Sequence, residues 1–137
     1  MIDAACIHPD HAAFRQVVED VGLLRRDCPV PTDVIGTYFE HFYDMVRKDE
    51  VITYTPEYAS ATVRALFDRD TPVAQWATLP SQFVIIQRIN LGLMAILAKL
   101  GATGNYRRIS EEIWPMVSGP PSTPLGQLEA SWLASRV

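Results

Sequence analysis

The hydrophobic positions of this chain recur mainly with the period of an α-helix. The first stripe keeps the spacing i, i+3, i+4, i+7, and Gly22 is placed to end that helix. A wider stripe follows CPVP, where we expect Thr32 to cap the helix and Asp33 to favour its positive end. The two stripes are Phe14, Val17, Val18 and Val21, and then Ile35, Tyr38, Phe39, Phe42, Met45 and Val46.

Three further helix starts carry recognisable capping chemistry. Thr55 and Pro56 predict an N-cap and a first helical residue, after an extended link around VITY. Asn105 can cap a short helix that Pro115 interrupts. Thr123, followed by proline, predicts a last helix after the GPPSTP break.

The most apolar segment, FVIIQRINLGLMAILAKLG, predicts a long helix over about 81–100 that Gly101 closes. Its length would just cross a bilayer. An arginine near the middle of such a helix, Arg88, costs about 2.5 to 3.5 kcal/mol on insertion scales, which argues against a membrane span. We therefore expect an all-α fold, an irregular bundle of about six helices around this central apolar helix.

Composition sets the class of protein. A chain of 137 residues with 48% hydrophobic and 20% charged residues predicts a single folded helical domain over 1–137. Its net charge of −4 argues against nucleic acid as a partner. Cys6 and Cys28 have no second pair, and the N-terminus lacks a basic region followed by an apolar one. Both observations favour a reducing cytoplasm.

Motifs for phosphate binding, serine activation and zinc binding do not occur, since GxGxxG, GxxxxGK[ST], GxSxG and HExxH are all missing. The segment His8-Pro9-Asp10-His11 offers metal-ligand chemistry, but a helix-start role for Asp10 is favoured. His41 is expected to be a packed or surface histidine rather than a general base. We therefore predict no catalytic, cofactor-binding or metal-binding residue in this chain.

Two weaker binding hypotheses stay open. Arg88 is expected to form a structural ion pair between helices, with contact to an anionic ligand as the alternative. A small apolar ligand between the second and fourth helices would be lined by Tyr38, Phe42, Ile86 and Met94, although these side chains suit an ordinary core equally well. The chain could also self-associate as a homodimer.

The segment LPSQFVIIQRINLGLMAILAKLGATGNYRRI, with Arg88, Leu91-Gly92-Leu93, Leu97, Leu100-Gly101-Ala102 and Asn105, resembles the C-terminal helical region of UbiB/AarF-type atypical kinase-like proteins. The upstream segments VVEDVGLLRRDCPVPTDVIGTYFEHFYDMV and EVITYTPEYASATVRALF are similar to the helices that follow the metal-binding DFG segment in that family. The resemblance spans nearly the whole chain and is most specific over 83–105.

The resemblance implies a non-catalytic domain that braces a kinase-like catalytic lobe, in the same polypeptide or as a partner, or that docks another protein. The KxGQ, ExD and DFG motifs, the alanine-rich loop and the catalytic lysine of the family are missing here. ATP and magnesium, and a link to quinone or lipid metabolism at a membrane periphery, would therefore belong to a longer kinase-like protein of which this chain is the C-terminal part. The chain alone is not expected to be an enzyme.

Overall fold

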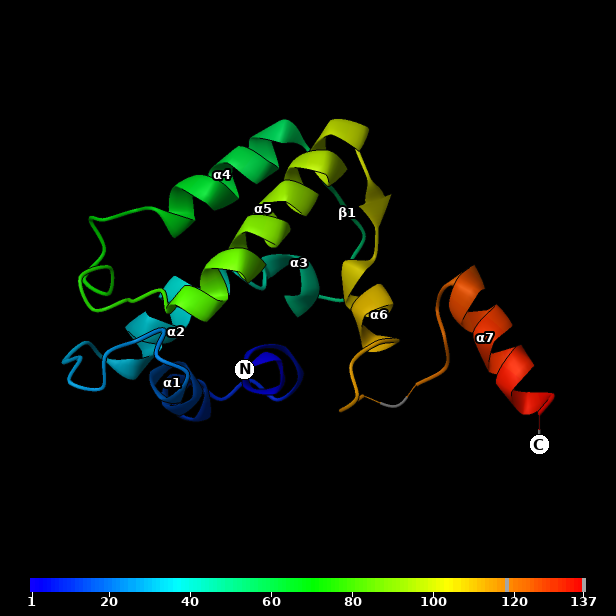
Figure 1. Ribbon diagram of the computed structural model, residues 1–137, viewed down its shortest axis with the longest axis horizontal. Coiled ribbons are helices and arrows are strands. Elements are labelled where there is room, and N and C mark those ends of the chain that lie inside the picture. The colour runs from blue at the N-terminus through cyan, green and yellow to red at the C-terminus, as the bar shows by residue number, and fades with distance from the viewer. Residues whose placement is uncertain (118, 137) are drawn as a thin grey trace.

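A computed structural model describes residues 1–117 and 119–136, and the fold is mainly α-helical, as predicted (Figure 1). The chain opens with a π-helical turn, η1 (Asp3–Ile7). The α-helices are α1 (His11–Asp20), α2 (Thr32–Glu40), α3 (Asp44–Arg47), α4 (Pro56–Leu66), α5 (Ser81–Leu100), α6 (Tyr106–Glu111) and α7 (Pro124–Ala134). Two short strands, β1 (Ile52–Thr53) and β2 (Thr103–Gly104), form an antiparallel pair.

The helix starts follow the predicted capping chemistry. The Asp10 carboxylate accepts hydrogen bonds from the amides of Ala12 and Ala13 at 2.9 and 3.0 Å, so it serves as the N-cap of α1. The N-caps of α4, α6 and α7 each accept from an amide three residues on, at 3.0–3.1 Å. These caps are Thr55, Asn105 and Thr123. Gly101 closes α5 in the left-handed conformation, with φ of +59°, as expected for glycine there.

The start and length of the second predicted helix were wrong. Pro31, not Thr32, is the N-cap of α2, because Thr32 is already its first helical residue; the hydroxyl of Thr32 accepts from the Arg15 guanidinium at 3.3 Å. The helix also ends at Glu40, where a turn with hydrogen bonds three residues back precedes the separate helix α3. The apolar stripe that predicted one helix is therefore shared between two.

The main core does not form around α5, so the predicted bundle around a central apolar helix is not confirmed. Nine buried residues gather between α1, α2 and the loops beside them, whereas only Met94 and Ala98 of α5 are buried. Those two form a second, smaller cluster with Tyr54, and Tyr58 and Ala59 of α4 pack against it. The nine are Phe14, Val18, Leu23, Leu24, Cys28, Val30, Ile35, Phe39 and Val73.

Arg107 connects the beginning of the chain to its second half. Its guanidinium donates to the carbonyl of Cys6 at 2.7 Å, to that of Val46 at 3.2 Å and to Glu111 at 2.6 Å. The same group lies over the ring of Trp114, 5.4 Å from its centroid. Since charge-assisted hydrogen bonds to carbonyls are stronger than neutral ones, Arg107 fastens η1 and α3 to α6.

Arg15 plays the equivalent part in the N-terminal half. It donates to the carbonyls of Cys28 and Val30 at 2.7 and 3.0 Å and pairs with Glu19 at 2.8 Å. The loop between α1 and α2 is thereby held against α1, so that its buried residues Leu23, Leu24 and Cys28 complete the main core.

Helix α7 stands apart from the other helices at the right of Figure 1. Its start is fixed by Glu112, whose carboxylate accepts from the amides of Ser122 and Thr123, both at 2.6 Å, and from their hydroxyls at 2.9 and 2.7 Å. Beyond this connection Leu125, Leu128, Trp132 and Leu133 stay exposed.

We predict that Arg107→Met lowers the free energy of unfolding by about 2 kcal/mol, because it leaves the carbonyls of Cys6 and Val46 without their donor. Urea denaturation followed by circular dichroism measures the change. Arg108→Met is the matched control, because its ion pair with Asp49 is exposed and screened, and it should change stability much less. Equal losses for the two variants would contradict this role of Arg107.

We predict that stability falls as the pH rises above about 10. Burial raises the pKa of each of the five tyrosines above its usual value, and that of Tyr43 to about 12. Between about pH 10 and 12 the unfolded chain releases phenolic protons that the folded chain retains, so unfolding becomes more favourable. Urea denaturation across this range checks the slope. Tyr43→Phe should make it shallower, and an unchanged slope would exclude a contribution from Tyr43.

Candidate functional site

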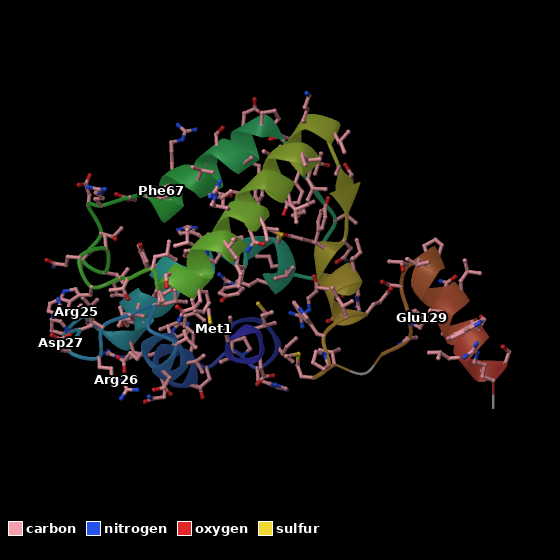
Figure 2. All side chains as sticks on the ribbon, viewed as in Figure 1. Met1, Arg25, Arg26, Asp27, Phe67 and Glu129 are labelled. Carbon is pink, nitrogen blue, oxygen red and sulfur yellow. The ribbon has the colours of Figure 1, made fainter. Side chains whose placement is uncertain are left out.

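A groove of about 430 Å³ lies between α2, the first half of α5 and the segment after α4. Helix α2 and the turn after it contribute Tyr38, Phe39, Phe42 and Tyr43, and α5 contributes Phe83, Ile86, Gln87, Asn90 and Leu91. Residues 67–79 form a further wall that begins at Phe67, and Met1 also lines the groove. Figure 2 labels both Phe67 and Met1. The size of the groove falls within the range of small-molecule sites.

Three of the four residues proposed from the sequence for an apolar pocket line this groove together. They are Tyr38, Phe42 and Ile86. Met94 does not, because it is buried in the second cluster against Tyr54. It lies on nearly the same side of α5 as the groove, but eight residues beyond Ile86, or about 12 Å along the helix axis. At that point α4 already covers α5.

Several polar groups of the groove have no hydrogen-bond partner within the described parts of the chain. These groups are the hydroxyl of Tyr38 and the side-chain amides of Gln87 and Asn90. A phenol is protonated at neutral pH, and burial raises the pKa of Tyr38 further. The groove therefore combines aromatic walls with hydrogen-bond donors and acceptors that a ligand could use.

The wall formed by residues 67–79 is held in place by the loop before α2. Thr78 donates its amide to the carbonyl of Leu23 at 2.9 Å, and Ala77 forms an isolated antiparallel bridge with Leu24. The guanidinium of Arg25 lies over the ring of Trp76, 4.9 Å from its centroid. These contacts attach the segment to the loop between α1 and α2.

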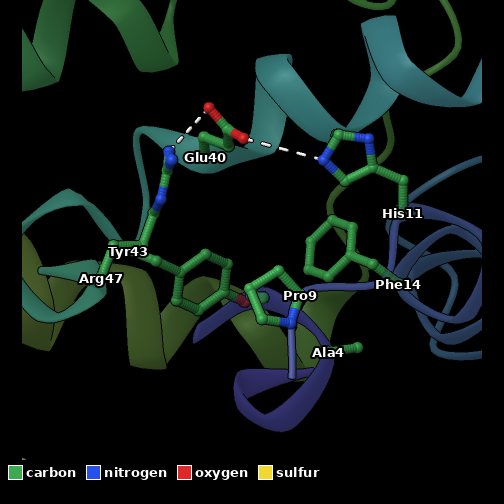
Figure 3. Close-up of a pocket in the computed structure, with 9 residues that line it drawn as sticks. Ala4, Pro9, His11, Phe14, Glu40, Tyr43 and Arg47 are labelled. Carbon is green, nitrogen blue, oxygen red and sulfur yellow. Dashed lines mark ion pairs between the residues drawn. The ribbon is translucent and has the colours of Figure 1, made fainter. Parts of the chain in front are cut away.

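A second, much smaller cavity lies between η1, α1 and α2 (Figure 3). Glu40 pairs there with Arg47 at 2.6 Å and stands 3.9 Å from His11. The cavity holds about 60 Å³, and no serine, threonine or cysteine is among its described lining residues. With its charges paired and no such hydroxyl or thiol, it offers neither room for a cofactor nor a nucleophile beside His11.

The histidines do not assemble a metal site. His8 pairs with Asp3 at 3.0 Å, while Asp10 caps α1 and His11 faces Glu40. His41 is exposed and lies 3.4 Å from Asp44. Within residues 1–117 and 119–136, no three side chains of His, Cys, Asp or Glu lie close enough together to hold a metal ion.

Arg88 is exposed on α5, and it forms no ion pair with any residue that the structure describes. The structural ion pair expected from the sequence is therefore not seen within the described chain. Beside Arg88 runs an apolar stripe whose side chains are 53–73% exposed. The stripe consists of Ile85, Ile89, Leu93, Ile96 and Leu100, and we call it the open face of α5.

The sequence reading missed Phe67 and Phe83 as groove residues. Phe67 follows α4, where it is 68% exposed, and its place in the groove depends on the course of the chain after that helix. Phe83 lies one helical turn before Ile86 on the same side of α5, so helical spacing from Ile86 could have found it.

Comparison with protein-family models, with curated proteins and with solved structures gives no significant match.

Proposed function

We propose that this chain is a non-catalytic helical docking domain that binds another protein through the open face of α5. The observation that supports this is the exposure of five large aliphatic side chains along one side of a single helix. Apolar surface of this extent is uncommon on monomeric proteins and marks interaction sites. Burying a fully exposed side chain of this size contributes about 1.5 to 3 kcal/mol, and more than half of each of these side chains is still exposed.

The open face has the geometry of a helix contact. Ile89, Leu93, Ile96 and Leu100 follow one another at spacings of four, three and four residues, which keeps them in line along the helix. Met94 and Ala98 lie on the opposite side and are buried. The helix is thus anchored to the domain by one side and presents the other side to a partner.

Charge defines the partner surface further. Arg88 and Lys99 flank the open face, and neither forms an ion pair within the described chain. A matching surface would be apolar with acidic residues at its rim, since oppositely charged rims favour association and fix its register. The resemblance to UbiB/AarF proteins suggests that this surface belongs to a kinase-like catalytic lobe, in the same polypeptide or in a separate one.

In such an assembly α5 would become the central helix that its composition predicts. Its covered side would remain against α4, and the open face would be buried by the lobe. ATP and magnesium would bind to that lobe and not to this domain. The lobe would carry the function in quinone or lipid-linked metabolism. The chain would act near a membrane only if the lobe does.

A bilayer is the competing environment for the open face. By length and composition α5 could span a membrane, with a mean hydropathy of 1.7 over its most apolar window and only 11% of that window buried. Arg88 near the middle of the helix disfavours insertion. Moreover, α5 is packed against α4 along one side, which favours a protein surface over lipid for the other.

A photo-crosslinking amino acid placed at Leu93, in the cells that make the protein, tests this proposal. We expect it to link to a polypeptide segment that carries the kinase-like motifs, and this linkage would be detected by mass spectrometry. The same amino acid at Ala95, exposed on another side of α5, is the control and should not link to that segment. Linkage of position 93 to lipid would contradict protein docking. Linkage to a second copy of the chain would replace the lobe by a homodimer.

A further inference from the structure

We propose that the groove between α2 and α5 binds a neutral, lipophilic small molecule that carries a hydrogen-bonding group. This site is separate from the open face, because Phe83, Ile86 and Asn90 line the groove whereas Ile89 and Leu93 do not. The proposal therefore does not depend on the docking partner.

The walls of the groove favour a lipophilic molecule with planar parts. Six aromatic rings line it, and at about 430 Å³ it accepts a drug-sized molecule. Phe67 contributes to it although its own side chain is 68% exposed. No other part of the described chain covers most of this ring. A ligand that covered it would remove apolar surface from water, which favours binding. The rings are those of Tyr38, Phe39, Phe42, Tyr43, Phe67 and Phe83.

The charges of the groove favour a neutral molecule. Asp68 and Arg69 are the charged side chains of its described lining, and they are neighbours of opposite sign. Their charges sum to zero, and both side chains are exposed to water, which screens them, so the side chains of the groove supply no net charge. Moving an uncompensated charge into such an apolar site would carry a large desolvation penalty. An anionic molecule of the same shape should therefore bind more weakly.

The unpaired polar groups favour a ligand with a hydrogen-bonding group. Gln87 and Asn90 lie on the α5 wall, and Tyr38 lies on the α2 wall. Their donors and acceptors have no partner in the described chain and would be shielded from water once the groove is filled. A ligand with no polar group would leave them unsatisfied, whereas one oxygen or N–H group within reach would avoid part of that loss.

Two fluorescent probes that differ by one charged group test the ligand class. N-phenyl-1-naphthylamine is neutral and has one N–H group, and 8-anilinonaphthalene-1-sulfonate adds a sulfonate to the same ring system. We expect the neutral probe to bind one per chain and at least about tenfold more tightly than the sulfonate, a difference of about 1.4 kcal/mol. Equal or tighter binding of the sulfonate would overturn the proposal.

A matched pair of variants locates the binding site. Ile86→Gln should weaken binding of the neutral probe at least about tenfold, whereas Ile89→Gln should leave it unchanged. The two isoleucines are 49% and 56% exposed on the same helix, so neither substitution should disrupt folding, which thermal melts would verify. Phe67→Ala, at an exposed position beyond α4, is a second groove variant and should also weaken binding.

The variants separate the two proposals. If both isoleucine substitutions weaken probe binding equally, the probe binds to the open face and the groove proposal fails, while docking through that face still stands. If only Ile86→Gln and Phe67→Ala weaken it, the groove proposal holds whatever cross-linking at position 93 shows. Binding of several probe molecules per chain, insensitive to all three substitutions, would also overturn the proposal.

Discussion

The arrangement of this chain follows from the fact that its longest and most apolar helix is covered on one side only. Met94 and Ala98 hold α5 to the domain, while the side from Ile85 to Leu100 stays in water. Hydrophobic burial dominates folding stability, so a chain that leaves this stripe exposed must be stabilised elsewhere. The main core between α1 and α2 provides that stability, and it forms almost without α5.

Arginine side chains join the parts that the two cores leave separate. Arg15 holds the loop before α2, and Arg107 fastens η1 and α3 to α6. Each donates to two backbone carbonyls that no helix or strand hydrogen bond satisfies, which is how a guanidinium with several donors stabilises irregular backbone. The strands β1 and β2 add a short link between the segments before α4 and after α5. The wall of the groove depends on similar backbone contacts at Leu24 and Thr78.

Helix ends could be predicted from the sequence, but the burial of α5 could not. The capping roles of Asp10, Thr55, Asn105 and Thr123 depend on amides within one turn, so local sequence determines them. Thr32 was predicted wrongly by one position, since it is the first helical residue rather than the cap, and its hydroxyl meets Arg15, seventeen residues away. The apolar composition of α5 predicts that most of the helix is buried, but it does not show which element or partner buries it. Ile86, one of the residues proposed for an apolar pocket, lines the groove. Helical spacing alone could not show that α4 covers Met94.

The two binding surfaces of α5 are separated by the geometry of the helix itself. At about 100° per residue, the groove residues Phe83, Ile86 and Asn90 centre roughly 90° away from Ile89, Leu93 and Ile96. A molecule in the groove would contact α5 from the side of α2, whereas a partner would contact it from the side that faces away from the domain. Because a single helix carries both sets, filling the groove would also fix the orientation at which α5 presents its open face to a partner.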